Sequence, residues 1–166
     1  VPFLCSLNLG HNQLANLGTI PSLGLKLHRL NLALNRLTSL DGIEALRGLR
    51  VLVVRGNQLT GELPSGLREL RRLVLLDMSH NQLYGAAMEP LASLTSLSTL
   101  RLAHNQLPVR ALQPLATALG SLALRRLELY ATPLARDTAF PDALLRVQPT
   151  LSELDHMTLP AGLLAG

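Results

Sequence analysis

The sequence predicts an α/β solenoid, a stack of repeated units with a parallel β-sheet on the concave face and turns or short helices on the convex face. Three observations predict this fold. Leucine supplies 45 of the 166 residues, about 27% where an ordinary globular chain has roughly a tenth. The leucines alternate with other residues in short stretches, as in a strand with one buried face. Asparagines follow these stretches at intervals of 22 to 24 residues, which indicates internal repeats.

Six segments match the pattern L-x-x-L-x-L-x-x-N-x-L in register. Within each segment the alternating residues predict a short strand, and the leucines of neighbouring units share one core because no single unit can bury its own apolar face. The segments are Leu4–Leu14, Leu27–Leu37, Leu49–Leu59, Leu73–Leu83, Leu97–Leu107 and Leu124–Leu134, and a degenerate seventh opens at Leu151.

This pattern resembles that of the leucine-rich-repeat family, and the resemblance covers nearly the whole chain. It implies a leucine-rich-repeat solenoid, which is a curved right-handed horseshoe with its parallel sheet on the concave face. Residues 1–134 are expected to form six repeats. Residues 135–166 are expected to form a C-terminal cap with a short helix and the degenerate seventh repeat.

An asparagine follows the strand segment in five of the six full repeats. It lies where the chain turns toward the convex side, and its buried amide is expected to satisfy backbone groups that the turn leaves unpaired. The role expected for these residues is therefore structural. They are Asn12, Asn35, Asn57, Asn81 and Asn105, with Thr132 at the same position of the sixth repeat.

The convex segments are expected to change from extended to helical along the chain. Residues 38–46 are short and turn-rich, and residues 59–64 resemble the L-x-G-x-I-P signature of plant-type repeats. In residues 113–120, Pro114 suits a first helical position and Gly120 suits a C-terminal stop.

The C-terminal end predicts a helix that begins near Pro141, places Phe140, Leu144 and Val147 against the last strand, and ends before Pro149. Residues 149–155 resemble the cap of short-repeat intracellular members of the family. This resemblance implies a cytoplasmic protein, by analogy cytoskeletal or axonemal.

The chain begins directly at a repeat, without a cap, an initiator methionine or a signal peptide. We therefore expect it to be the ordered part of a longer protein, and the alternative is a partner docked on the open end. Because it lacks N-x-[ST] sites and capping cysteine clusters, an extracellular recognition domain is disfavoured. That class nevertheless stays open as an alternative.

The third and fifth positions of each unit are expected to face solvent on the concave sheet. An apolar centre rimmed by arginine and carboxylates is typical of a protein-binding surface. The alternative is that valines simply suit a sheet and that the charges are solvated. The candidate partner-binding residues are Arg29, Asn31, Val51, Val53, Leu75, Asp77, Arg101, Arg126, Glu128 and Tyr130.

Two other ligand classes are disfavoured. His80 and His104 lie in adjacent repeats, but two ligands seldom suffice for a metal. The formal charge of +4 and the pI near 10.2 suggest nucleic acid. However, carboxylates interleave with the concave arginines and stacking aromatics are few. The stretch that holds Arg68, Arg71 and Arg72 is expected to be a solvated convex face.

No enzyme motif is present. The sequence has no G-x-S-x-G, no phosphate-cradling glycine loop and no H-E-x-x-H, so we expect no catalytic residue, cofactor or small-molecule substrate. No apolar run approaches the roughly 18 residues of a membrane span. The leading hypothesis is a non-enzymatic scaffold that binds another protein on the concave sheet. An RNA-associated scaffold of a ribonucleoprotein is the second hypothesis.

Overall fold

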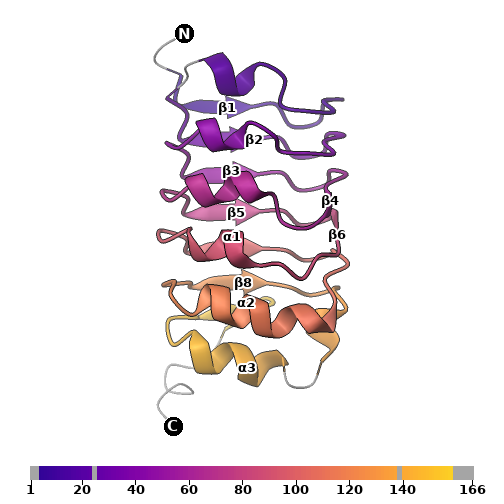
Figure 1. Ribbon diagram of the computed structural model, residues 1–166, viewed down its shortest axis with the longest axis vertical. Helices are drawn as coiled ribbons and strands as arrows, with labels where there is room; N and C mark the ends of the chain where they lie inside the picture. Colours follow the sequence, from indigo (N-terminus) through magenta and orange to yellow (C-terminus); the bar gives the residue numbers. More distant parts are fainter. Residues whose placement is uncertain (1–3, 24–25, 138–139, 159–166) are drawn as a thin grey trace.

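The computed structural model describes residues 4–23, 26–137 and 140–158, and each turn of the chain contributes one strand to a shared sheet (Figure 1). The strand order is β1-β2-β3-β5-β7-β8-β9-β10. All neighbours pair in parallel except β10, which is antiparallel to β9. The strands are β1 Ser6–Asn8, β2 Arg29–Asn31, β3 Val51–Val53, β5 Leu75–Asp77, β7 Thr99–Arg101, β8 Arg126–Glu128, β9 Glu153–Leu154 and β10 Met157–Thr158.

The strands align residue for residue, so equivalent repeat positions lie side by side. The fourth position forms one buried row, because its side chain points away from the solvent-facing third and fifth positions. The leucines of this row from β2 to β9 are at most 2% exposed, and burial of each stabilises the fold by about 2 kcal/mol. They are Leu30, Leu52, Leu76, Leu100, Leu127 and Leu154.

The opposite side changes from 3₁₀ turns to α-helices along the chain, and this confirms the predicted direction (Figure 1). Helix α2 begins at Leu112, two residues before Pro114. Proline is tolerated there because the N–H groups of a first helical turn have no intrahelical partner. The segments are η1 Ile20–Leu23, η2 Ile43–Ala45, η3 Ser65–Glu69, α1 Glu89–Ala92, η4 Val109–Ala111, α2 Leu112–Leu119, η5 Leu134–Arg136 and α3 Phe140–Val147.

Helix α3 occupies the residues predicted for it and ends before Pro149. It buries Phe140 and Leu144 and lies beside α2 (Figure 1). A second, two-stranded parallel sheet joins β4 (Thr60–Gly61) to β6 (Gln82–Leu83). The repeat pattern did not predict this small sheet, which links the third and fourth repeats outside the main one.

Each inner asparagine joins two successive repeats. The amide nitrogen of Asn81 donates to the carbonyl oxygens of Met78 (3.0 Å) and Ser79 (3.2 Å) in its own turn, and to Val54 (3.1 Å) in the preceding repeat. Its Oδ1 accepts the N–H of Leu59 (3.0 Å). The same pattern recurs at Asn35, Asn57 and Asn105. The predicted structural role of these four residues is confirmed.

The two ends of this series differ from the inner members. Asn12 is exposed, so the expectation that its amide is buried is wrong. The amide donates only within its own turn, to Leu9 and Gly10, since no described strand lies before β1 to cover it. Thr132 donates its hydroxyl to Leu129 and accepts the N–H of Ala135, and both partners belong to its own repeat.

Asn81→Ala should lower the free energy of unfolding by about 3 kcal/mol, because it leaves several buried backbone groups without partners. Asn12→Ala, whose amide is exposed, should cost less than about 1 kcal/mol. Urea denaturation followed by circular dichroism measures both. Equal losses for the two variants would contradict the structural assignment.

Candidate functional site

The face of the sheet that carries the third and fifth positions, here called the strand face, holds nine of the ten candidate binding residues. Because β2, β3, β5, β7 and β8 pair in register, residues far apart in sequence become neighbours. The third-position row runs through Arg29, Val51, Leu75, Thr99 and Arg126. The fifth-position row runs through Asn31, Val53, Asp77, Arg101 and Glu128.

An apolar patch occupies the middle of the strand face. It consists of Val51, Val53 and Leu75, and the pairing places Val51 directly beside Leu75. All three side chains are partly exposed, so this part of the sheet presents hydrocarbon to solvent. Asn31 lies next to the patch, and its Oδ1 accepts the N–H of Ala33 (3.0 Å). The side-chain oxygen of Asn31 is thus engaged in the turn that follows β2.

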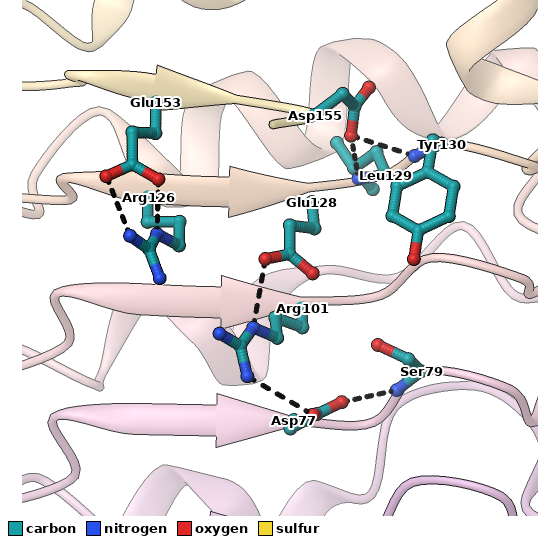
Figure 2. A network of polar contacts seen from close by, with 9 residues as sticks. All are labelled: Asp77, Ser79, Arg101, Arg126, Glu128, Leu129, Tyr130, Glu153 and Asp155. Atoms are coloured by element: carbon teal, nitrogen blue, oxygen red, sulfur yellow. Dashed lines mark hydrogen bonds and ion pairs between the residues drawn. The ribbon is translucent and has the colours of Figure 1, made fainter. Parts of the chain in front are cut away.

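Arg101 bridges two carboxylates on the strands beside it (Figure 2). Its Nε lies 3.0 Å from Glu128 Oε1, and its Nη1 lies 3.6 Å from Asp77 Oδ2. Asp77 also accepts the N–H of Ser79 at 3.0 Å. Asp77 is 4% exposed and Glu128 is 6% exposed. The prediction that both face solvent is wrong, because the Arg101 side chain and the neighbouring strands enclose them.

A second ion pair joins Arg126 to Glu153 through two contacts, Nε–Oε2 at 2.6 Å and Nη2–Oε1 at 2.7 Å (Figure 2). The hydrogen bond and the charge of Glu153 raise the pKa of Arg126. The hydrogen bond from Arg126 lowers the pKa of Glu153. Asp155 accepts the backbone N–H groups of Leu129 and Tyr130. The charges at this end of the strand face are therefore matched inside the protein.

A ladder of rings follows the edge where the strands end, and we call His80, His104, Tyr130 and His156 the ring ladder. His80 and His104 stack with centroids 4.1 Å apart and planes inclined by 16°. Tyr130 contacts His104 and His156, with centroids 5.1 Å apart in each pair. Tyr130, the tenth candidate, thus lies at this edge beyond β8.

The left-handed backbone before the asparagines places the two stacked histidines. The φ angle is 54° at His80 and 53° at His104, a conformation with a small cost for residues other than glycine. Stacked rings hold their nitrogen lone pairs in parallel planes, so the pair is poorly arranged to share one ion. Within residues 4–23, 26–137 and 140–158, no three His, Cys, Asp or Glu side chains are grouped to hold a metal.

Burial, more than any other cause, lowers the pKa of His80. The positive charges of His104 and Arg55 lower it further, and Asp77 opposes them. Arg55 Nη2 lies 3.3 Å from His80 Nε2. The lowered pKa favours the neutral ring, whose Nε2 is placed to accept a hydrogen bond from the Arg55 guanidinium. The repeat pattern of the sequence did not predict the contact between Arg55 and His80, because this contact depends on the directions of the two side chains.

An open cavity of about 510 Å³ lies on the opposite side of the second and third repeats. Four carboxylates, one arginine and several hydroxyl groups line it. Glu69 pairs with Arg47 at 3.0 Å, and Glu62 accepts the N–H of Ala87 at 2.8 Å. Two of the four carboxylates thus already have partners in the protein. The charged lining residues are Asp41, Glu44, Glu62, Arg68 and Glu69.

The three arginines of the stretch predicted to be a solvated convex face are all exposed. Arg68 lies on η3 and lines the cavity. Arg71 and Arg72 lie in the turn that leads into β5. All three side chains are thus solvated, as the sequence predicted. None of the helices in the described part of the chain has the length and hydropathy to cross a membrane.

His104→Asn should raise the pKa of His80, because it removes a positive neighbour and opens the stacked face to water. Asparagine tolerates the left-handed backbone at this position. A pH titration of the imidazole resonances by NMR measures the change. His156→Asn, at the far end of the ring ladder, is the matched control and should leave His80 unaffected. An unchanged His80 pKa in His104→Asn would contradict the stacking.

The chain matches known proteins by motif and by fold. The Leucine Rich Repeat family model matches residues 48–70. An internalin from Listeria monocytogenes has a TM-score of 0.69 and 22% identity, over 94% of this chain and 48% of its own.

The leucine-rich-repeat ectodomain of the Arabidopsis receptor kinase HAESA, in complex with an N-terminally extended IDA peptide hormone, has a TM-score of 0.63. It shares 26% identity, over 91% of this chain and 25% of its own. The chain thus spans about half of the internalin and a quarter of the ectodomain. No curated protein matches the sequence. The repeat pattern, the family match at residues 48–70 and the stacked parallel sheet show that the chain contains leucine-rich repeats and has the leucine-rich-repeat fold.

Proposed function

We propose that the chain is a non-enzymatic module that binds another protein on its strand face, over the apolar patch. The observation that carries this proposal is the grouping of Val51, Val53 and Leu75 on two adjacent strands of a partly exposed surface. An apolar group of this kind, rimmed by polar residues, is typical of protein interaction sites. HAESA, a structural relative, was solved with a peptide ligand, and this supports a peptide or protein partner here.

On the rest of the strand face, ion pairs hold charged side chains in place, and this also supports the proposal. Asp77 and Glu128 are fixed by Arg101, and Arg126 is fixed by Glu153. Side chains already held in place lose little conformational entropy when a partner arrives. Such a surface favours a partner that leaves these pairs intact and gains its affinity from the apolar patch.

An RNA-associated scaffold is less well supported. The two arginines that would contact phosphates, Arg101 and Arg126, are held by carboxylates in the protein. A phosphate would have to displace Glu128 or Glu153, or add negative charge beside them. The paired arginines on the strand face therefore favour a protein partner.

We also propose an intracellular protein, on the resemblance of residues 149–155 to the cap of intracellular family members. The alternative is an extracellular recognition domain, the setting of the HAESA ectodomain. Fractionation of cells that express the tagged full-length protein separates the two. Recovery in the medium or on the outer cell surface would contradict an intracellular location.

Val53→Arg or Leu75→Glu should abolish capture of the partner, because each places a charge within the apolar patch. Affinity capture of the full-length protein from its own cells, with cross-linking to locate contacts, measures the loss. Thermal melting should change little, since both side chains are partly exposed. Val109→Arg, at an exposed position on η4, is the matched control and should retain the partner. Capture by both patch variants would overturn the proposal.

A further inference from the structure

Six cationic side chains gather on the turns that lead into β2, β3 and β5 and on the start of β2, and we call them the basic edge. All six are exposed. Segments 26–29, 47–50 and 69–72 contain a single carboxylate, Glu69. The basic edge with Glu69 thus carries a formal charge of +5, more than the +4 of the whole chain. Its members are Lys26, Arg29, Arg47, Arg50, Arg71 and Arg72.

Backbone hydrogen bonds place these segments in adjacent rows. The N–H of Arg50 donates to the carbonyl of His28 at 2.8 Å, and the N–H of Val74 donates to the carbonyl of Arg50 at 2.8 Å. Neighbouring strands lie about 4.8 Å apart, so the three turns present their cations within roughly two strand spacings. Figure 1 shows the turns stacked along the side of the sheet where the strands begin.

The basic edge lacks the matching charges found elsewhere on the sheet. Arg101 and Arg126 each have carboxylates beside them. Within the described residues, no carboxylate lies at ion-pair distance from Arg29, Arg50, Arg71 or Arg72. Arg47 pairs with Glu69 on an exposed surface, where such a pair contributes little. A group of like charges this close attracts an anionic partner over about one Debye length, roughly 8 Å in physiological salt.

The basic edge is continuous with the apolar patch. Arg29 pairs in register with Val51, which pairs with Leu75. Val74, next to Arg50 in the adjacent row, is 41% exposed. A ligand that crosses from the edge onto the strand face therefore meets charge first and hydrocarbon next. The two tyrosines lie elsewhere, Tyr84 after β6 and Tyr130 after β8, so they offer no stacking surface for nucleic-acid bases at this edge.

We propose that the basic edge binds an acidic segment of the protein partner, rich in Asp and Glu, which adjoins the apolar residues that occupy the patch. This inference rests on the proposed function and names the chemistry of its partner. Guanidinium groups bind carboxylates through two parallel hydrogen bonds, and five of the six cations are arginine. The carboxylates of the acidic segment supply the negative charge that balances the basic edge, which Glu69 alone does not balance.

The test is a selection of random displayed peptides on the purified full chain, followed by fluorescence anisotropy with a selected peptide. We expect selected sequences in which Asp and Glu adjoin Leu, Ile, Val or Phe. Arg50→Glu combined with Arg72→Glu should weaken binding about tenfold or more and reduce its salt dependence. The matched control reverses Arg110 and Arg136, which are exposed on η4 and η5, and should bind as the unmodified chain does.

The double variant Arg50→Gln, Arg72→Gln removes the two charges without reversing them. It should weaken peptide binding less than the double reversal does, and its thermal melting should be unchanged, which shows that the loss does not come from unfolding. Selected peptides without acidic enrichment would overturn the inference. So would an oligouridine probe that binds more tightly than the peptides and is sensitive to the same reversals. Self-association of the chain that disappears in Arg50→Glu, Arg72→Glu would identify a second copy as the occupant instead.

The two proposals fail separately. If Val53→Arg abolishes peptide binding while the Arg50 and Arg72 reversals leave it intact, the basic-edge inference is wrong and the apolar patch stands. If the reversals abolish binding of an acidic peptide and Val53→Arg leaves it intact, the basic edge is supported. In that outcome the proposal that the partner docks over the apolar patch fails.

Discussion

The structure depends on the hydrogen bonds of the inner asparagines, because they join each repeat to the one before it. A strand of three residues cannot fold alone, and the turn that follows it leaves backbone groups unpaired. Asn57 shows how one side chain meets both needs. Its amide donates to Val54 in its own turn and to Leu32 in the preceding repeat, and it accepts the N–H of Leu37. Stacking and turn formation are thereby coupled in one buried group.

This coupling holds the register of the sheet, and the register determines the functional surface. Residues more than twenty positions apart become direct neighbours, as Asp77 and Arg101 do. A slip of one residue would turn the leucines of the buried row toward solvent. The same constraint produces both the charge pairs at one end of the strand face and the unmatched arginines at the other, because each repeat contributes its variable residues at equivalent places.

The strand face is electrostatically asymmetric. Toward β8 and β9, charged side chains form ion pairs within the protein, as Glu128 does with Arg101 and Arg126 does with Glu153. Toward β2 and β3, arginines such as Arg50 are exposed and have no carboxylate at ion-pair distance in the part of the chain that the structure describes. Between them lies the apolar patch. Affinity and orientation of a partner can thus come from different regions, hydrocarbon burial from the patch and long-range attraction from the basic edge.

The sequence by itself determined the fold, the positions of the strands, the buried leucines and helix α3. These follow from local periodicity, which repeats with little variation from unit to unit. It also identified Val51, Val53 and Leu75 as neighbours, because register alone places them together. Only the tertiary structure decided that Asp77 and Glu128 are enclosed by Arg101, that His80 stacks on His104, and that Arg55 lies beside His80. Those outcomes depend on side-chain direction, which a repeat pattern does not encode.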